Sequence, residues 1–210
     1  MSEYHKINSV FKRDSVTKKL IINDWSCEEF ELLQNCEWDF TEKVDGTNIR
    51  INIDECGEIK IDGRTANAQI PSKLLAHLYQ LFSGWDKEYL RGIFPSGVIL
   101  YGEGFGKGIQ KVGFNYGDDQ RFVLFDVKIG GYWLSRENVF DVGNKLNLPV
   151  VPVIGSGSLH SAIEITSGGF TSTWGEFPAE GIVARPKIEL LTKTGHRIIT
   201  KIKHIDFYPS

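Results

Sequence analysis

Hydrophobic residues alternate with polar ones along much of the chain, which is the period of a strand with one buried face. The clearest run covers residues 40–53, and its apolar positions are Phe40, Val44, Ile49, Ile51 and Ile53. The alternation breaks at Asp45-Gly46, a dipeptide typical of turns and bulges. We therefore expect Lys43, which lies just before the break, to end a strand and to face a cleft.

Further strands are predicted over residues 58–62, 98–101, 121–127, 132–134, 180–185 and 197–203. Leucine spacing predicts an amphipathic helix over residues 71–82, and shorter helices are expected over 86–93, 135–146 and 159–165. The Ser26-x-x-Glu29 spacing resembles a capping box and predicts a short helix that ends near Leu33. No internal repeat, low-complexity tract or convincing linker is present, so we expect one domain over residues 1–210.

Composition places the chain among soluble globular proteins. It has 210 residues, of which 41% are hydrophobic and 24% are charged, and its formal net charge is −3. This charge argues against wholesale coating of a nucleic acid, so any such binding must use a local basic patch. One basic segment is the first twenty residues, where a phosphate-contacting arm is the less usual alternative to a solvated face. Another is residues 186–210, which hold five lysines and arginines against two acids.

Cysteine usage and the absence of export signals indicate an intracellular setting. Cys27, Cys36 and Cys56 have no metal-ligand spacing, and an odd number of cysteines suits a reducing compartment. The N-terminus is polar and no long apolar run occurs, so we expect no signal peptide and no membrane span. Cytoplasmic localisation is therefore the default prediction.

Lys43 is a candidate nucleophile only if something lowers its pKa. A free lysine has a pKa of about 10.4, so removing its proton at neutral pH costs roughly 4–5 kcal/mol. Nearby cations lower a lysine pKa, whereas the flanking Glu42 and Asp45 raise it. Lys201 and Lys203 alternate onto one face of a predicted strand and could supply the cations, each worth up to ~4 kcal/mol at about 4 Å. The alternative is an ordinary surface lysine paired with Glu42 or Asp45.

Other candidates come from predicted strand ends. The acids there are Asp45, Glu103 and Glu180, and one strand carries Phe122 and Phe125. Residues 102–108 are rich in glycine but fit neither common phosphate-binding template, so we expect tight backbone around Glu103, whose carboxylate emerges from a strand end. Arg64 follows a strand next to Lys43 and is a further candidate. Each residue has a structural alternative, but together they indicate a site for a base, a ribose and a triphosphate near a lysine.

At this point the sequence resembles a known family, the covalent nucleotidyltransferases, and within it the RNA ligases of the RNA ligase 2 type. The resemblance runs from about residue 40 to 203. The matching segments are Glu42-Lys43-Val44-Asp45-Gly46-Thr47-Asn48, Tyr101-Gly102-Glu103 with Gly106, Ile109-Gln110-Lys111, Phe122-Val123-Leu124-Phe125-Asp126, Glu180-Gly181-Ile182-Val183 and Lys201-Ile202-Lys203. Asn48 favours RNA ligases, because DNA ligases and capping enzymes usually carry arginine there.

The resemblance implies an ATP-dependent RNA ligase that uses Mg²⁺ or Mn²⁺. Lys43 would attack the α-phosphate of ATP and form lysyl-AMP. AMP would then pass to an RNA 5′-phosphate, and a 3′-hydroxyl would displace it to seal the strand. The implied fold is α+β, with antiparallel β-sheets that form a nucleotide cleft flanked by helices, as in the catalytic domains of DNA ligases and mRNA capping enzymes.

The resemblance also assigns roles to single residues. The implied catalytic residues are Lys43, Glu180, Lys201 and Lys203, and the implied binding residues are Glu42, Asn48, Arg64, Glu103, Gln110 and Phe125. Glu42 would read the adenine edge, Phe125 would stack on its face, and Glu103 would accept from the ribose. Arg64 would join the two strand lysines in holding phosphates, and Asn48 and Gln110 would belong to the sealing site. Asp45 and Glu180 would hold the metal ion through water.

Only seven residues follow the last motif, so we expect a lone nucleotidyltransferase domain without a C-terminal accessory domain. Its RNA partner would then be held with help from a partner protein or from the basic N-terminal segment. Two other functions stay open. One is an mRNA capping guanylyltransferase that uses GTP, and the other is a non-catalytic nucleotide- or RNA-binding module of the same fold.

Overall fold

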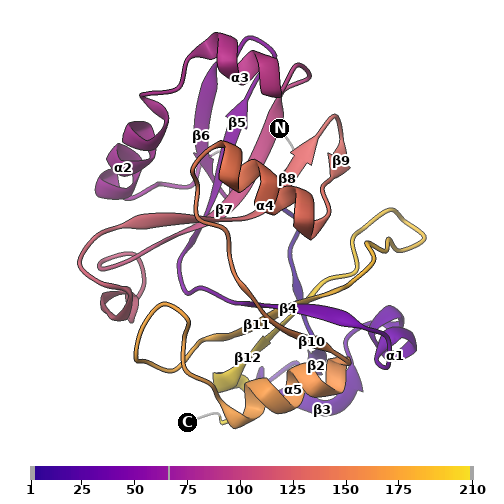
Figure 1. Ribbon diagram of the computed structural model, residues 1–210. Helices are drawn as coiled ribbons and strands as arrows, with labels where there is room; N and C mark the ends of the chain where they lie inside the picture. The colour runs from indigo at the N-terminus through magenta and orange to yellow at the C-terminus, as the bar shows by residue number, and fades with distance from the viewer. Residues whose placement is uncertain (1–2, 66, 209–210) are drawn as a thin grey trace. The chain divides into compact units, whose positions relative to one another are not determined.

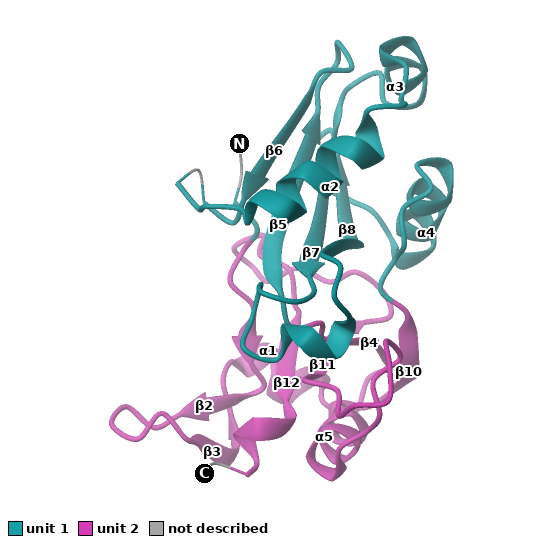
Figure 2. Cartoon of the chain, turned by 90° about the vertical axis from the view of Figure 1, so that its left-hand side faces the viewer, with its two compact units in different colours: residues 1–4, 45–151 teal, residues 5–44, 152–210 magenta. Residues whose placement is uncertain are grey.

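The computed structural model describes residues 3–65 and 67–208 and divides the chain into two compact units (Figures 1 and 2). Unit 1 comprises Met1–Tyr4 and Asp45–Val151, and unit 2 comprises His5–Val44 and Pro152–Ser210. One boundary therefore falls between Val44 and Asp45, directly after the residue that follows Lys43. Each unit contains its own hydrophobic core. In the described part of the chain, no helix is both long and apolar enough to cross a bilayer.

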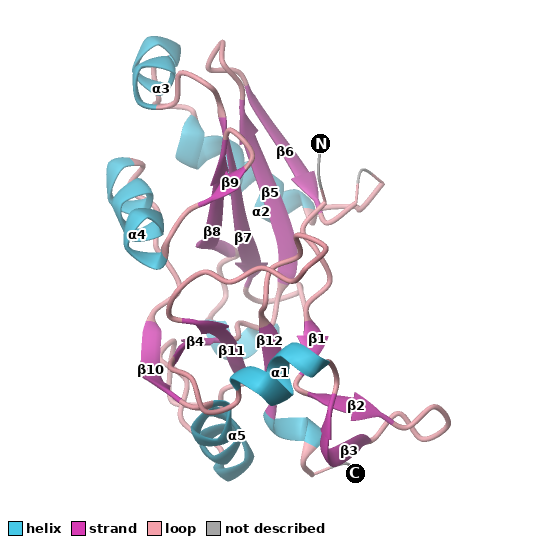
Figure 3. Ribbon diagram, turned by 90° about the vertical axis from the view of Figure 1, so that its right-hand side faces the viewer, coloured by secondary structure: helices cyan, strands magenta, loops and turns pink. Residues whose placement is uncertain are grey.

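Unit 1 is built on a five-stranded antiparallel sheet of order β6-β5-β7-β8-β9 (Figure 3). Its strands are β5 (Thr47–Ile53), β6 (Ile59–Gly63), β7 (Val98–Phe105), β8 (Arg121–Ile129) and β9 (Tyr132–Trp133). Its helices are α2 (Ser72–Phe82), α3 (Lys87–Ile93), α4 (Arg136–Lys145) and the 3₁₀ turn η1 (Gly113–Tyr116). Ile49, Ile51 and Ile53 pack in one cluster with residues of α2, α3 and α4. Because strand side chains alternate, the residues between them point to the other face.

That other face of the unit 1 sheet carries polar and aromatic residues. Asn48 of β5 is paired with Glu103 of β7, and Arg50 is paired with Tyr101. The register between β7 and β8 shifts where Tyr101 faces Asp126 and the next residue faces Leu124, so Phe125 is the bulged residue. A bulge inserts one residue and turns its side chain. Phe125 consequently contacts the ring of Tyr4, which also packs against Tyr101.

Unit 2 contains a second five-stranded sheet, of order β1-β12-β11-β4-β10. Its strands are β1 (Asn8–Ser9), β4 (Trp38–Glu42), β10 (Val153–Gly157), β11 (Gly181–Pro186) and β12 (Thr200–Lys203), and only β1 runs parallel to its neighbour. A separate ribbon pairs β2 (Phe11–Arg13) with β3 (Leu20–Trp25). The remaining elements are α1 (Glu28–Leu33), α5 (Leu159–Gly168) and η2 (His204–Asp206). Trp38, Phe40 and Ile182 form the core with Leu159 and Ala162 of α5.

Most elements agree with the pattern-based prediction, and the α+β fold with antiparallel sheets is confirmed. Ser135 caps α4 as predicted, because its side chain accepts a hydrogen bond from the N–H of Asn138. The predicted capping box is wrong. Cys27, not Ser26, is the N-cap of α1, and it makes no side-chain cap hydrogen bond. The Ser26 hydroxyl is buried and makes no hydrogen bond in the described part of the chain.

The predicted glycine-rich loop after residue 101 is also corrected, because β7 continues through Phe105. Its glycines serve packing. A Cβ atom on Gly102 would lie 2.2 Å from the Phe122 ring, and one on Gly104 would lie 2.3 Å from Leu74. Glu103 therefore lies within a strand and not at its end, and neighbouring strands fix its position on both sides.

Candidate active site

Lys43 directly follows β4 and is held by the β11 backbone. Its N–H donates to the carbonyl of Gly181 at 2.8 Å, and Gly181 is registered with Lys203 of β12. Residues in register share a face, and Lys201 lies two residues before Lys203, so the three lysines occupy one face of the unit 2 sheet. The structure thus brings together the lysine after β4 and the two lysines of the last strand, 158 and 160 residues further on by number.

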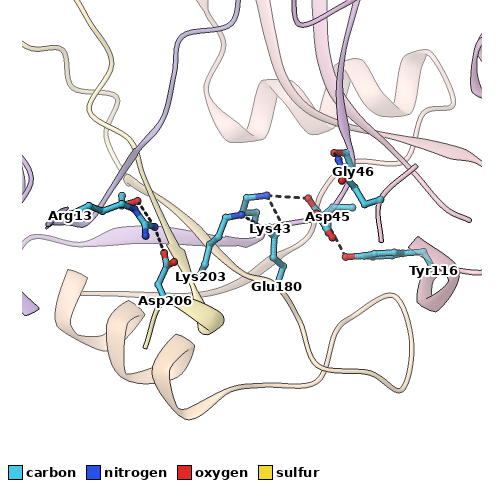
Figure 4. Close-up of polar contacts among 11 residues, drawn as sticks. Arg13, Lys43, Asp45, Gly46, Tyr116, Glu180, Lys203 and Asp206 are labelled. Atoms are coloured by element: carbon cyan, nitrogen blue, oxygen red, sulfur yellow. Dashed lines mark hydrogen bonds and ion pairs between the residues drawn. The ribbon is translucent and has the colours of Figure 1, made fainter. Parts of the chain in front are cut away.

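Glu180 joins two of these lysines (Figure 4). Its Oε2 lies 2.6 Å from Nζ of Lys43, and its Oε1 lies 2.6 Å from Nζ of Lys203. The Glu180 side chain is 14% exposed, so the pairs are only partly screened by water. Gly181 lets the backbones of β11 and β12 pack closely beside Glu180, because a Cβ atom on Gly181 would lie 2.0 Å from the carbonyl oxygen of Ile202. One carboxylate therefore orients two ammonium groups.

Lys201 has no ion pair among the residues that the structure describes. Burial lowers the pKa of Lys201, and the positive charges of Lys203, Lys43 and Arg13 lower it further, whereas Glu180 raises it. Four cations therefore act on one another in this part of unit 2. Such uncompensated positive charge favours an anionic ligand, since an anion replaces repulsion by attraction.

Glu42 lies on the opposite face of β4 from Lys43, because it is registered with the core residue Ile182. Its side chain is buried, and its Oε1 accepts a hydrogen bond from Oγ of Ser172 at 2.5 Å. Its Oε2 accepts from the N–H of Thr173 at 2.8 Å and from the Thr173 hydroxyl at 2.6 Å. Sequence reasoning missed Ser172 and Thr173. They lie in the serine- and threonine-rich stretch 156–178, whose composition indicates a loop but not its partner.

In unit 1, the residues after Lys43 are fixed by η1 and by the loop before it. The N–H of Asp45 donates to the Tyr116 hydroxyl at 3.0 Å, and Nε2 of Gln110 donates to the Gly46 carbonyl at 2.7 Å. Gly46 fits tightly, because a Cβ atom there would lie 2.2 Å from the carbonyl oxygen of Gly104. Tyr116 is a further residue that the sequence did not indicate, and the chain from Asp45 to Gly46 is thereby held by two side chains.

The polar face of the unit 1 sheet carries the remaining candidates. Asn48 and Glu103 are direct cross-strand partners, and Oδ1 of Asn48 is buried without a hydrogen bond among the described residues. A buried acceptor of this kind is costly unless a donor reaches it, so it indicates a place for a ligand hydroxyl or amine. Arg64 follows β6 and is exposed to solvent.

Phe125 is half-buried, and its ring packs against an aromatic cluster. The ring of Tyr4 meets it edge-on with centroids 5.1 Å apart, and the Tyr4 hydroxyl donates to Oδ2 of buried Asp126 at 2.7 Å. Phe122, the other aromatic residue of this strand, lies in the hydrophobic core. Of the two predicted phenylalanines, Phe125 is therefore the one with a partly exposed ring.

Asp45 and Glu180 are the predicted metal ligands. Among the described residues, no group of three or more His, Cys, Asp or Glu side chains is arranged to hold a metal ion directly. Both oxygens of Glu180 already accept from lysines, so direct coordination would displace an ammonium group. Carboxylate oxygens suit Mg²⁺ and Mn²⁺, and Mg²⁺ usually keeps several waters. The donor set fits an ion held through water.

Comparison with solved structures places the fold among RNA ligases. The chain is similar to Naegleria gruberi RNA ligase in a form with ATP and Mn (TM-score 0.65, 17% identity, 83% of this chain and 51% of that one). It is similarly close to the forms with PPi (TM-score 0.64, 19% identity, 83% and 51%) and with AMP and Mn (TM-score 0.63, 17% identity, 83% and 52%). The chain thus spans about half the length of these structures.

Among curated proteins, no significant sequence match is found. The model of the RNA ligase family matches residues 37–203, which include the Lys43 stretch, Glu180 and both lysines of β12. The matched segment covers well over half of the chain. The protein belongs to the RNA ligase family.

Proposed function

We propose that this protein is an ATP-dependent RNA ligase that joins RNA 5′-phosphate and 3′-hydroxyl ends through a lysyl-AMP intermediate. The observation that carries the proposal is the carboxylate of Glu180 shared by Lys43 and Lys203, with Lys201 beside them lacking an ion pair among the described residues. A family member with one oriented lysine and surplus positive charge has the groups that covalent nucleotidyl transfer needs.

In the proposed first step, Nζ of Lys43 forms a bond to the α-phosphorus of ATP while the bond from this phosphorus to the bridging oxygen breaks. Pyrophosphate leaves with that oxygen. The Lys43 ammonium group first gives one proton to Glu180, whose Oε2 is 2.6 Å away, and this leaves a lone pair on Nζ for the attack. The amine releases its second proton to solvent as the N–P bond forms. Lys201 and Lys203 stabilise the negative charge that develops on the phosphates. The AMP group then moves to an RNA 5′-phosphate, and attack by a 3′-hydroxyl releases AMP and closes the strand.

The base and ribose contacts form the second part of the proposal. Phe125 stacks on adenine, Glu103 accepts a hydrogen bond from the ribose, and Glu42 reads the adenine edge with the lone pairs that its present partners leave on Oε1. Asn48 and Gln110 belong to the sealing site, and Arg64 contacts phosphate. We propose that residues 1–210 act as one nucleotidyltransferase domain.

ATP and a divalent ion, Mg²⁺ or Mn²⁺, are the proposed cofactors. The Naegleria gruberi structures with ATP and Mn and with AMP and Mn support this assignment by fold similarity. Asp45 and Glu180 would hold the ion through water, and it would supply charge neutralisation for the phosphates. The protein is proposed to act in the cytoplasm on RNA ends, with a partner protein to help hold the RNA.

The test measures how much label the protein retains from α-labelled ATP or GTP. Wild-type protein, Lys43→Ala and the control Lys193→Ala, which replaces an exposed lysine, are incubated with ATP or GTP and Mg²⁺ or Mn²⁺. We expect retained label from ATP in wild type and control but not in Lys43→Ala, and its release on a chase with nicked, 5′-phosphorylated RNA.

Label retained only from GTP would replace the proposal by the capping reaction. No retained label under any of these conditions would support the non-catalytic module. Retained label that RNA cannot discharge would reject RNA as the acceptor.

A further inference from the structure

A basic pocket with a volume of about 520 Å³ lies in unit 2. The N-terminal strands β1 and β2 line one part of it, and the end of β12 with η2 lines another. Its polar lining includes Lys6, Arg13, Ser26, Lys201 and Lys203. Lys43 and Glu180 are not among the lining residues, so the pocket shares two lysines with the proposed reaction site but extends away from the nucleophile along the N-terminal segment.

The pocket carries more positive than negative charge. Lys12 also lines it, and Asp206 is its one acidic lining residue, which Arg13 contacts at 2.5 Å (Figure 4). Lys12 is paired with Asp24, and Lys203 is paired with Glu180. Lys6 and Lys201 have no ion pair in the part of the chain that the structure covers. Burial is the main cause of the lowered pKa of Lys201, and the charges of Lys203 and Arg13 lower it further.

Ser26 adds an unused donor to the same pocket. Its Oγ is buried and makes no hydrogen bond among the described residues. A buried hydroxyl without a partner is uncommon, because it forfeits hydrogen bonds to water. Lysine ammonium groups can only donate hydrogen bonds, and the Ser26 hydroxyl can donate one as well. The pocket therefore favours a ligand that is negatively charged and rich in acceptors. Phosphate has this chemistry.

The size and walls of the pocket favour a nucleotide unit over a bare phosphate. Pockets of several hundred Å³ accommodate small organic ligands. Beside the cations, the lining includes Ile7 and Ile205, of which Ile205 is 64% exposed, and Phe11 of the buried core lies beneath them. Apolar side chains next to lysines match a ribose or base that is attached to a phosphate.

We propose that this pocket is a subsite for one nucleotide of the RNA strand, with the RNA phosphate held by Lys6, Lys201 and the Ser26 hydroxyl. The assignment rests on the proposed function. Phosphate groups of ATP have the same chemistry as those of RNA, so the test must separate the two sources. Lys6 and Ser26 serve this purpose, because neither belongs to the proposed reaction site.

The experiment compares full-length wild type, Lys6→Ala, Ser26→Ala and the control Lys19→Ala, in which an exposed lysine of the same segment is removed outside the pocket. Binding of a fluorescent 5′-phosphorylated RNA is followed by anisotropy at several salt concentrations. AMP retention from α-labelled ATP is measured in parallel. We expect Lys6→Ala to weaken RNA binding several-fold and to lower the salt slope by about 0.7, the value for one phosphate contact on a single strand.

Ser26→Ala should weaken RNA binding without a change in the salt slope, because the hydroxyl is neutral. In both variants the loss of RNA affinity should exceed any change in AMP retention. Three outcomes would overturn the proposal. The first is a loss of RNA affinity in Lys6→Ala no larger than that in Lys19→Ala, and the second is a wild type that does not bind the RNA at low salt. The third is a loss confined to AMP retention, which would assign the pocket to phosphates of ATP. If wild type retains no AMP but Lys6→Ala still weakens RNA binding, the subsite stands and the ligase proposal fails.

Discussion

Thr173 holds the carboxylate of Glu42 with two donors, its backbone N–H and its hydroxyl, both directed at Oε2. The contact joins the strand before Lys43 to a loop residue 131 positions further along the chain. Because Glu42 is buried, each lost donor leaves an acceptor that water reaches poorly.

Removing the Thr173 hydroxyl should therefore destabilise the protein and loosen the proposed base site. We expect Thr173→Val to lower the free energy of unfolding by about 1–2 kcal/mol and to raise the KM for ATP in AMP transfer. Urea denaturation and label retention measure the two effects. Thr171→Val is the matched control, because Thr171 is exposed on the same loop. Equal stability of the two variants would contradict the role assigned to Thr173.

Replacing Glu180 by glutamine removes the negative charge of this side chain and keeps its shape. In Glu180→Gln, Lys43 and Lys203 lose their common counter-ion, and the lysines repel one another. We expect AMP retention to fall at least about 10²-fold and the free energy of unfolding to fall by about 1–3 kcal/mol. Added salt should restore part of the stability but not the activity, because salt screens repulsion.

The control for this substitution is Glu176→Gln, which changes an exposed acid of the same loop region. A Glu180→Gln protein that retains AMP as well as this control does would remove Glu180 from the proposed reaction.

Lys201 should reduce the stability of the folded protein at neutral pH. Its pKa is lowered in the folded state by burial and by Lys203, Lys43 and Arg13. Below that folded pKa both states bind the proton, and the folded state carries the full penalty. As pH rises through the folded pKa toward the ordinary lysine value, the folded state releases the proton first and the penalty fades.

We therefore expect Lys201→Met to be more stable than wild type at pH 7 and low salt, with a difference that shrinks toward about pH 10. Denaturant titrations at both pH values measure it, beside Lys193→Met as an exposed control. If Lys201→Met proves less stable than wild type at pH 7, the charge crowding described for unit 2 is not a cost of folding.

Gly102 should tolerate no side chain. A Cβ atom there would lie 2.2 Å from the Phe122 ring and 2.4 Å from the carbonyl oxygen of Val123. We expect Gly102→Ala to lower the free energy of unfolding by about 1–3 kcal/mol, which corresponds to a Tm lower by roughly 2–12 °C for a chain of this length.

Gly84→Ala is the control for this prediction, since no atom lies within 4 Å of its added Cβ position. Calorimetry of the two variants compares them directly. A Gly102→Ala Tm within a degree of the control would show that β7 and β8 can separate at little cost.

Local patterns predicted the strands of the unit 1 sheet and most helices, because alternation and leucine spacing report which face of an element is buried. They did not predict β1, β2 or β3 in the basic N-terminal segment. The grouping of Lys43, Lys201 and Lys203 also followed from sequence, once alternation placed both late lysines on one face. The partners of Glu42 could not be predicted in this way. Ser172 and Thr173 reach it through a loop whose path depends on tertiary packing, and such residues carry no periodic signal.

The orientation of Phe125, one of the predicted candidates, depends on a bulge in the register between β7 and β8 and not on any one strand. Two predictions that the structure corrects also have physical causes. Ser26 has the spacing of a capping residue, but the helix begins one residue later and the hydroxyl remains without a hydrogen bond in the described structure. The glycines of residues 102–108 predict a loop, but β7 continues through Phe105, because close packing against Phe122 and Leu74 also requires glycine.

The position of unit 1 within the sequence affects how the protein acquires its reactive centre during synthesis. Residues 45–151 separate β4 from β10, β11 and β12 of the unit 2 sheet, and the Lys43–Glu180 pair spans 137 positions. Contacts so distant along the chain form late, because much loop entropy must be lost first. The ribosome must also release residue 203 before the lysine pair of β12 can assemble. A prematurely terminated polypeptide would therefore carry the proposed nucleophile without its counter-ion or cations, and we expect incomplete chains to be unable to consume ATP.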